Sequence, residues 1–275
     1  MILFPNCKIN LGLHIMRKRS DGFHDLETVF YPLAVKDILE IVKKDDSELP
    51  VELMTTGLAI EGDPAANLCI KAYSLLKQDY PWLTPVQMHL HKLIPIGAGL
   101  GGGSSDATHT LLLLNALFEL GLSQLQLNTY ALQLGSDCAF FLLNKPCFAT
   151  GRGEPKAEIA LDLSGYSFVL VNPGIHINTG WAFSTIIPRN LRPGPKEEQL
   201  EDAIQLPVSD WKHHLVNDFE RPVFDLYPEI KAIRDILYSE GAVFSGMTGT
   251  GSTVFGMFKT TPTLDFLQKY RVINC

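Results

Sequence analysis

Basic clusters are scarce in this sequence of 275 residues, which carries 23 Lys and Arg against 30 Asp and Glu. The longest basic run is Arg17-Lys18-Arg19, and the formal net charge at pH 7 is −7. A protein whose main task is to grip a nucleic-acid backbone carries a basic face or an excess of positive charge. We therefore expect no nucleic-acid partner, although a few local groups would suffice for a small phosphorylated ligand.

Paired cysteines are also lacking. The cysteines are odd in number, widely spaced and free of any C-x-x-C pair: Cys7, Cys69, Cys138, Cys147 and Cys275. This pattern predicts neither a disulfide framework nor a zinc knuckle. It fits a reducing cytoplasm.

Long apolar runs are missing too. The first five residues contain no basic stretch ahead of an apolar run, so they do not predict a signal peptide. The most apolar stretch, residues 111–122, is interrupted by Asn115 and Glu119, and a bilayer span needs about 20 apolar residues. We expect a cytoplasmic protein with no membrane partner. With 46% hydrophobic residues, the chain is able to bury a sizeable core in one large domain or two smaller ones.

Apolar and polar residues alternate from Cys7 to Ile15, which predicts a half-buried strand with Lys8 on its polar face. Taken alone, Lys8 is typical of a solvated strand face. The Ser-Asp-Gly sequence at 20–22 predicts a turn, and residues 27–35 predict the returning strand of a hairpin.

A glycine-rich loop gives the sharpest chemical signal. A strand predicted over 86–94 runs into P-I-G-A-G-L-G-G-G-S-S-D at 95–106, and helical spacing follows over 107–120. Glycines let the backbone approach an anion, and the N–H groups at the start of the helix point toward it. The loop therefore predicts a phosphate site. A plain linker is the alternative, and Ser104, Ser105 and Asp106 are also typical helix caps, with Asp106 as suited to a cap as to a ligand role.

Two common phosphate motifs fit this loop poorly. The Walker pattern fails because no Lys follows any of the glycines. Gly97, Gly99 and Gly102 match the dinucleotide pattern G-x-G-x-x-G, but a second predicted helix follows where that fold requires a strand ending in an acidic residue. A nicotinamide oxidoreductase remains an alternative.

Beyond the loop, spacing predicts a helix over 125–134 and a short apolar segment over 138–143, with Asp137 as a typical N-cap between them. Turn-forming residues gather at 151–155. We place a boundary there and predict two domains, residues 1–153 and residues 154–275.

The second half predicts several shorter elements. They are strands over 167–171, 242–244 and 253–258, helices over 209–219 and 228–239, a surface loop over 187–202, and a second glycine cluster over 245–252.

Several segments together resemble the GHMP kinases, the small-molecule kinases named for galactose, homoserine, mevalonate and phosphomevalonate. The loop at 95–107 is similar to the second motif of that family. The other segments are P-N-C-K-I-N-L at 5–11, R-S-D-G-F-H at 19–24, L-G-S-D at 134–137, N-D-F-E at 217–220 and T-G-T-G-S-T-V-F at 248–255. The resemblance covers nearly the whole chain. It implies an α+β fold of two domains, the first like domain 2 of ribosomal protein S5 and the second ferredoxin-like.

The resemblance further implies that ATP is the co-substrate and that its phosphates lie on the first glycine loop. That loop consists of Pro95, Ile96, Gly97, Ala98, Gly99, Leu100, Gly101, Gly102, Gly103, Ser104 and Ser105. The second glycine loop contains Gly249, Thr250 and Gly251. Mg²⁺ is expected with ATP because the transferred phosphoryl group carries charge that needs neutralising. The sequence does not identify protein ligands for the metal.

The family's catalytic pair falls on Lys8 and Asp137. In the family pattern Asp137 takes the proton from the acceptor hydroxyl, and Lys8 orients that hydroxyl and offsets charge. The turn at 19–24 is similar to that of members acting in isoprenoid biosynthesis by the non-mevalonate pathway. For this chain the likeness implies ATP-dependent phosphorylation of the C2 hydroxyl of 4-diphosphocytidyl-2-C-methyl-D-erythritol.

For that substrate the resemblance implies a cytidine ring held between Phe23 and Phe183, the latter within a match that begins at Thr179. Asn10 and His24 would contact the cytidine and the diphosphate end. Phe23 stands where the family commonly has Tyr, which keeps the stacking face. A mevalonate or homoserine kinase, and a nucleotide-binding relative without activity, remain alternatives. We expect a monomer or a weak homodimer.

Overall fold

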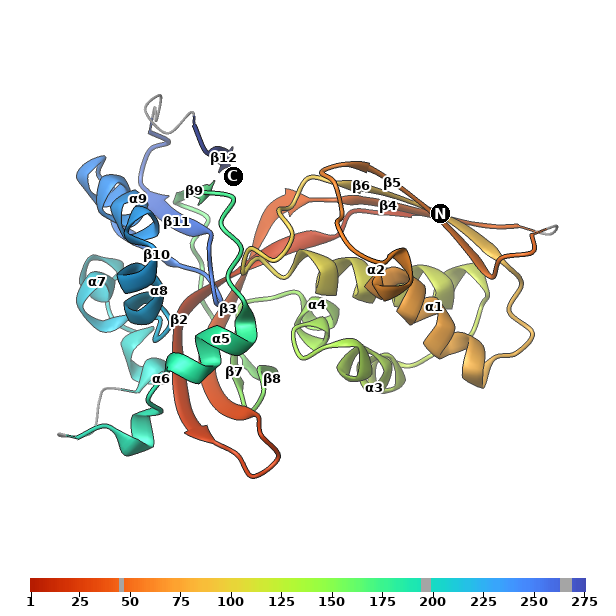
Figure 1. Ribbon diagram of the computed structural model, residues 1–275, viewed down its shortest axis with the longest axis horizontal. Helices are drawn as coiled ribbons and strands as arrows, with labels where there is room; N and C mark the ends of the chain where they lie inside the picture. Colours follow the sequence, from red (N-terminus) through yellow and green to blue (C-terminus); the bar gives the residue numbers. More distant parts are fainter. Residues whose placement is uncertain (45–46, 194–198, 263–268) are drawn as a thin grey trace. The chain divides into compact units, whose positions relative to one another are not determined.

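The computed structural model describes residues 1–44, 47–193, 199–262 and 269–275 (Figure 1). The chain forms two compact units that interleave along the sequence. Unit 1 consists of Met1–Cys7, Ala34–Ile96 and Gly101–Asn144, and unit 2 of Lys8–Leu33, Gly97–Leu100 and Lys145–Cys275. No helix among the described residues is long and apolar enough to cross a membrane.

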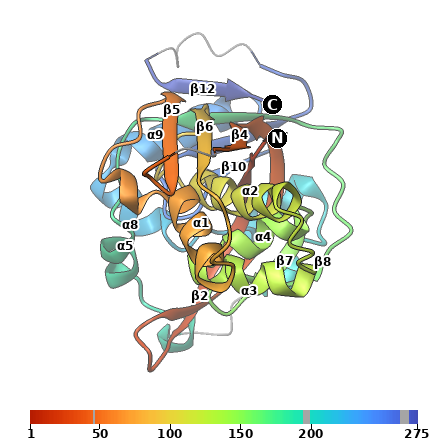
Figure 2. The same cartoon turned by 90° about the vertical axis from the view of Figure 1, so that its right-hand side faces the viewer.

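Unit 1 is a four-stranded sheet with helices on one face (Figure 2). The sheet order is β1 (Ile2–Leu3), β4 (Ile38–Lys43), β6 (Val86–Lys92) and β5 (Val51–Gly57). β4 runs antiparallel to both its neighbours, and β5 runs parallel to β6. The helices are α1 (Leu68–Asp79), α2 (Gly102–Leu117), α3 (Gln124–Leu134) and α4 (Cys138–Leu143), with a short 3₁₀ turn at Pro64–Ala66.

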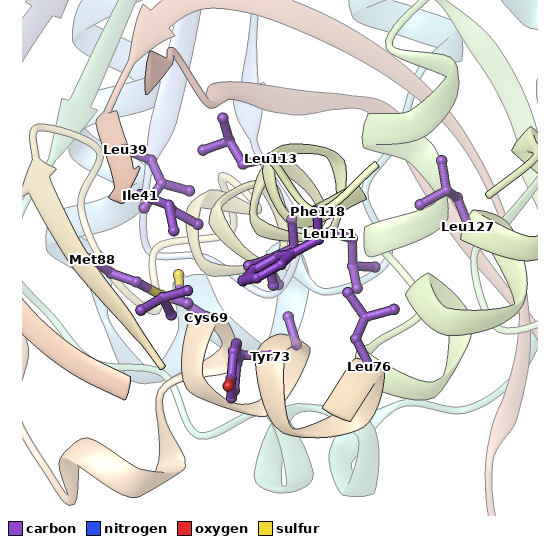
Figure 3. Close-up of a cluster of buried hydrophobic side chains, with 14 of the residues drawn as sticks. Leu39, Ile41, Cys69, Tyr73, Leu76, Met88, Leu111, Leu113, Phe118 and Leu127 are labelled. Carbon is purple, nitrogen blue, oxygen red and sulfur yellow. The ribbon is translucent and has the colours of Figure 1, made fainter. Parts of the chain in front are cut away.

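The core of unit 1 lies between this sheet and its helices (Figure 3). Alternate residues of β4 point inward, so Leu39 and Ile41 are buried while Ile38 and Val42 are exposed. The helices contribute further side chains to the cluster, including Cys69, Tyr73 and Leu76 from α1, Leu111 from α2 and Phe118 just after α2. Each large apolar side chain buried here contributes roughly 1.5–3 kcal/mol of transfer free energy. This packing anchors α2, whose amino end carries the first glycine loop.

Unit 2 contains a second sheet, in the order β10 (Phe244–Met247), β11 (Val254–Phe258), β9 (Ser167–Asn172) and β12 (Arg271–Asn274). Each pair of adjacent strands in this sheet is antiparallel. This order and these directions are those of a ferredoxin-like sheet, as the resemblance to the GHMP kinases implies. The helices of the unit are α5 (Thr179–Thr185), α6 (Leu200–Ala203), α7 (Trp211–His214), α8 (Glu220–Leu226) and α9 (Pro228–Ser239), with 3₁₀ turns at Arg189–Leu191 and Val208–Asp210.

A third sheet, mostly within unit 2, has the order β2 (Asn6–Lys18), β3 (His24–Lys36), β7 (Cys147–Thr150) and β8 (Glu154–Glu158). The hairpin of β2 and β3 confirms the pattern predicted for 7–35. The turn formers at 151–153 join β7 to β8 within this sheet, so the boundary placed there falls in a hairpin. The division into domains 1–153 and 154–275 stays a prediction.

The predicted mixture of helices and strands is confirmed, and so are the strand at 86–94, the helix at 125–134 and α9. Other expectations were wrong in detail. β2 is buried on both faces and not half-buried: Lys8, Asn10 and His14 are each at most 3% exposed. The reason is that polar partners from other parts of the chain cover its polar face.

Some boundaries also differ. Residues 215–219 are not helical. The strand predicted over 242–244 is β10, which begins at Phe244 and extends to Met247 within the second glycine cluster. The segment predicted as a surface loop over 187–202 contains a 3₁₀ turn and the start of α6, whose Leu200 is fully buried. Part of it, residues 194–198, lies outside the described residues.

Candidate active site

The amino end of α2 has the glycine-rich form that suits an anion site. The helix begins at Gly102, five residues before the predicted start, and its N-cap is Gly101 in the left-handed conformation (φ 70°). The N-cap glycine has no side chain with which to cap this end. The first N–H groups of a helix have no intrahelical acceptors, so those of α2 are available to a phosphate.

Of the two roles left open for Asp106, helix capping is wrong, because this residue lies inside α2. Its carboxylate accepts a hydrogen bond from Lys92 Nζ at 2.7 Å. Ser105 Oγ lies 3.4 Å from His109 Nδ1, one turn further along. The polar side chains after the glycines therefore make contacts within unit 1 and do not close the helix end.

Asp137 lies in unit 1 beside that end of α2. It occupies the N-cap position of α4, yet its side chain makes no capping hydrogen bond to that helix, all of whose residues are described. The neighbouring Cys138 thiol is hydrogen-bonded to Ser104, and the Thr108 hydroxyl donates to the Cys138 carbonyl at 2.9 Å. These two contacts fix the segment that carries Asp137 to the first turns of α2.

Lys8 lies in unit 2, inside β2, and is 3% exposed. Its ammonium donates to Asn10 Oδ1 at 2.6 Å and to the Gly99 carbonyl at 3.1 Å, and it lies 5.0 Å from the centre of the Phe30 ring. The Lys8 backbone N–H donates to the Leu100 carbonyl at 3.0 Å. A buried cation held in this way is a positioned group and not the solvated surface residue that its pattern suggests in isolation.

The two glycine loops meet in unit 2. The Thr248 hydroxyl lies 3.0 Å from the Gly99 carbonyl and 3.1 Å from Asn10 Oδ1. Gly99 has a positive φ of 78°, and a Cβ atom there would lie 2.0 Å from the Thr248 carbonyl oxygen. Only glycine permits this approach. Gly249 packs against Gly99 from the other side of the contact, since its own Cβ would lie 2.9 Å from Gly99 Cα.

Sequence reasoning missed two residues that complete this arrangement. Thr28 accepts from Asn10 Nδ2 at 2.8 Å and donates to the Gly12 carbonyl at 2.6 Å. Asn217 Nδ2 donates to the carbonyls of Met247 and Gly249 at 2.7 and 2.8 Å. Asn217 stands in a segment that the sequence had singled out, but Thr28 lies in an ordinary strand pattern and gives no such signal.

The residues expected to hold cytidine are also in unit 2. The rings of His24 and Phe183 stack at 5.0 Å with an interplanar angle of 23°, and burial lowers the pKa of His24. Phe23 is 50% exposed, and the Arg152 guanidinium lies 3.9 Å from its ring centre. Thr179 is the exposed first residue of α5. The structure thus brings Phe183 to His24, and the pairing of Phe183 with Phe23 stays a prediction.

Each unit therefore gathers part of the expected site. Lys8, Asn10 and Gly99 meet in unit 2, and Ser104 and the segment of Asp137 meet in unit 1. Lys8 and Asp137 belong to different units, and their pairing stays a prediction. Among the described residues no three His, Cys, Asp or Glu side chains gather as a metal site.

Comparisons with known proteins match both parts of the chain to one family. The family model for the GHMP kinases N terminal domain matches residues 67–145, and that for the GHMP kinases C terminal matches residues 203–270.

Curated relatives are similar over nearly the whole length. A 4-diphosphocytidyl-2-C-methyl-D-erythritol kinase of Bacteroides fragilis is 50% identical over 258 residues, which covers 94% of this chain and 92% of the relative. A protein of the same name from Cytophaga hutchinsonii is 46% identical over 263 residues, covering 95% and 94% of the two chains.

Solved structures agree. A crystal structure of 4-(cytidine 5'-diphospho)-2C-methyl-D-erythritol kinase has a TM-score of 0.78 and 31% identity, and the match covers 94% of this chain and 90% of the other. A crystal structure of mevalonate kinase shares the fold at a TM-score of 0.71 and 14% identity, covering 100% and 98%. The nicotinamide alternative is excluded by these matches. The chain belongs to the GHMP kinases, and within them to the family of the 4-diphosphocytidyl-2-C-methyl-D-erythritol kinases.

Proposed function

We propose that this protein phosphorylates the C2 hydroxyl of 4-diphosphocytidyl-2-C-methyl-D-erythritol, giving the 2-phosphate and ADP, in isoprenoid biosynthesis by the non-mevalonate pathway. As a GHMP kinase it is a small-molecule kinase with ATP as co-substrate. The observation that carries the substrate is the 50% identity, over 94% of the chain, to a relative named for this reaction.

The ATP phosphates would lie on Pro95–Ser105. The glycine N-cap of α2 supports this assignment, because the N–H groups at this helix end and the helix dipole favour an anion. The close contact between Gly99 and Gly249 fixes the middle of the loop, residues 97–100. Backbone donors held in this way need no rearrangement when the phosphates arrive.

Phosphoryl transfer would proceed by attack of the substrate C2 oxygen on the γ-phosphorus, with cleavage of the bond to ADP. The hydroxyl proton would pass to the Asp137 carboxylate. Such a reaction has a loose transition state, so positioning and charge stabilisation matter more than a strong base. Lys8 would orient the hydroxyl and offset negative charge, and its burial between Asn10 and Gly99 supports a fixed position for its ammonium.

The cytidine ring would stack on Phe23 and Phe183, with Asn10 and His24 near the cytidine and the diphosphate end and Thr179 at the start of α5. The stack of His24 on Phe183 supports a shared role for these two residues. The Phe23 ring is half exposed, and because the Arg152 guanidinium lies over one of its faces, a planar ligand would stack on the other face.

Mg²⁺ would accompany ATP and neutralise phosphate charge. Because the described residues contain no cluster of three His, Cys, Asp or Glu side chains suited to a metal, we propose that the ion is carried mainly by the phosphates and by water.

We also propose a cytoplasmic location, no nucleic-acid or membrane partner, and a monomer or weak homodimer. The cysteines, which are odd in number and form no C-x-x-C pair, support a reducing compartment, and the net charge of −7 argues against a nucleic-acid partner. Sedimentation velocity across a range of protein concentrations tests the oligomeric state.

The substrate is tested by ADP release from the purified protein with ATP and Mg²⁺. We expect release that depends on 4-diphosphocytidyl-2-C-methyl-D-erythritol and is absent with mevalonate or homoserine. Release with one of those two acceptors alone would assign the protein to another GHMP activity. Binding of ATP without release under any condition would indicate a relative that has lost catalysis.

A further inference from the structure

Three buried charged residues lie in unit 1 near the two ends of the first glycine loop. Lys92 is the last residue of β6, Asp37 joins β3 to β4, and Asp106 lies in the second turn of α2. They are 1%, 0% and 3% exposed. The Lys92 ammonium donates to Asp37 Oδ2 and, at 2.7 Å, to Asp106 Oδ2. We call these three residues the buried trio.

The trio connects the two ends of the glycine loop. Asp37 Oδ1 accepts hydrogen bonds from the N–H groups of Leu93 and Ile94 at 2.6 and 2.9 Å, where the chain leaves β6. Lys92 then links Asp37 to Asp106, on the helix that begins where the loop ends. A Cβ atom on Gly102 would lie 3.4 Å from Lys92 Nζ, so the ammonium itself lies against the first turn of α2.

This arrangement is unfavourable for stability alone. Two carboxylates share one ammonium out of water, which leaves an excess negative charge when all three are ionised. Within the part of the chain that the structure describes, Asp106 Oδ1 is buried without a hydrogen-bond partner. An apolar set of similar volume would avoid both costs. A trio retained at the base of a binding loop therefore points to a role in the function of the loop.

Burial raises the pKa of Asp106 to about 7, with Lys92 opposing the shift and Asp37 adding to it. The other titratable group facing it is the Cys69 thiol of α1, which burial keeps protonated by raising its pKa to about 12. Since ionisation of Asp106 at higher pH is disfavoured in the folded state, a neutral residue there is expected to leave stability at pH 8 equal or increased.

We propose that Asp106 is a positioning residue for ATP: by accepting from Lys92 it holds the amino end of α2 in register with the end of β6. This inference rests on the proposed function, because ATP is assigned to the loop between these two elements. Asp106 acts here through its acceptor oxygen, so asparagine at this position should preserve the role and alanine should abolish it.

Three variants test the inference: Asp106→Ala, Asp106→Asn and, as a control, Asp79→Ala. Asp79 is an exposed carboxylate at the end of α1 in the same unit, where it accepts from the Tyr130 hydroxyl. Steady-state kinetics with varied ATP would be measured on folded protein, together with thermal unfolding at pH 8. The affinity for a fluorescent ATP analogue gives a readout that does not require turnover.

For Asp106→Ala we expect kcat/KM for ATP to fall by about tenfold or more, since small misplacements of reacting groups cost that much or more. We expect Asp106→Asn to recover most of the loss and to unfold at the same temperature as the wild type or higher. Asp79→Ala should match the wild type. The KM for the second substrate should change little in all three.

The inference is overturned if folded Asp106→Ala keeps wild-type kinetics toward ATP, which would leave the trio a purely structural feature. It is equally overturned if Asp106→Asn is as impaired as Asp106→Ala. A wild-type protein without ADP release would instead count against the proposed function, and the binding of the ATP analogue to the same variants would still decide the role of Asp106.

Discussion

Lys8 and Thr248 reach the same oxygen atom, the backbone carbonyl of Gly99: Lys8 Nζ lies 3.1 Å from it and Thr248 Oγ1 lies 3.0 Å from it. Their side chains also converge on Asn10 Oδ1, at 2.6 and 3.1 Å. The proposed catalytic lysine is thereby held against the middle of the first glycine loop. Through the acceptors that it shares with Thr248, it is also linked to the second glycine cluster. A change in any of these residues should reach the chemistry through the position of the Lys8 ammonium.

Gly99→Ala should separate the two glycine loops. The added Cβ would lie 2.0 Å from the Thr248 carbonyl oxygen, and the φ of 78° strains any side chain there. We expect a loss of at least about 1–3 kcal/mol in the free energy of unfolding, measured by urea denaturation, together with lower activity. Gly103→Ala is the matched control for stability, because its Cβ would meet nothing nearer than 4.0 Å and it lies in a helix. A Gly99→Ala protein as stable as Gly103→Ala would contradict the close contact.

Lys8→Met should lower kcat while the protein stays folded. The substitution keeps most of the buried stem and removes the ammonium that donates to Gly99 and Asn10. Loss of one group that stabilises developing charge costs about 10²- to 10³-fold in kcat. The check is steady-state kinetics with both substrates varied. If only the KM for the phosphoryl acceptor rises, Lys8 is a binding residue.

Phe23→Ala should weaken the binding of the cytidine substrate without affecting the binding of ATP. A base stacked on an aromatic side chain gains about 1–3 kcal/mol, so the KM for the acceptor should rise roughly tenfold to a hundredfold. Phe23→Tyr keeps the ring and serves as the control that should behave like the wild type. An unchanged acceptor KM in Phe23→Ala would remove Phe23 from the cytidine site. A matching rise in the KM for ATP would show a general disturbance.

His14 should make the fold sensitive to mild acid. Burial, with the neighbouring Arg189, lowers the pKa of His14 to about 4, while Asp218 opposes the shift and Arg192 adds to it. Its unfolded value is about 6.5, so the unfolded state binds the proton first, and stability falls as the pH drops from 6.5 toward 4. Between pH 7 and pH 5 this group alone should remove about 2 kcal/mol of stability.

The measurement for His14 is urea denaturation of the wild type and His14→Gln at pH 7 and at pH 5. Because glutamine does not titrate, the variant should lose less stability than the wild type over this interval. An equal loss in both proteins would show that other groups cause the acid sensitivity.

Local sequence patterns predicted much of the fold. The structure differs from these predictions where tertiary contacts determine the local conformation. The helix α2 was expected to start at residue 107, where the helical apolar spacing begins, and glycine ordinarily disfavours helices. Gly102 is helical nonetheless, and a Cβ there would lie 2.9 Å from a methyl group of Ile94, so close packing on the strand end requires glycine. Helix α8 was missed because it contains Pro222, which the first turn of a helix tolerates.

The residues of the candidate site also differ in how far the sequence predicts them. The glycine loop, Lys8 and Asp137 stand in contiguous segments with a recognisable order of residue types. The buried trio joins positions 37, 92 and 106, and although Asp106 stands in the glycine-loop motif, nothing in the sequence pairs it with Asp37 or Lys92. Burial of Lys8 was not predicted either. The alternation of apolar and polar residues in a strand shows on which face a residue lies, but it does not show what covers that face.

The most direct test of the account is ADP release by Asp137→Asn with ATP, Mg²⁺ and 4-diphosphocytidyl-2-C-methyl-D-erythritol, beside the wild type and Asp79→Ala. The account predicts substrate-dependent release by the wild type and the control, and a loss of about 10²- to 10⁴-fold in the variant, since general-base assistance is worth that much. ATP affinity, measured by calorimetry, should be unchanged. Near-normal turnover by folded Asp137→Asn would contradict the assignment of the base.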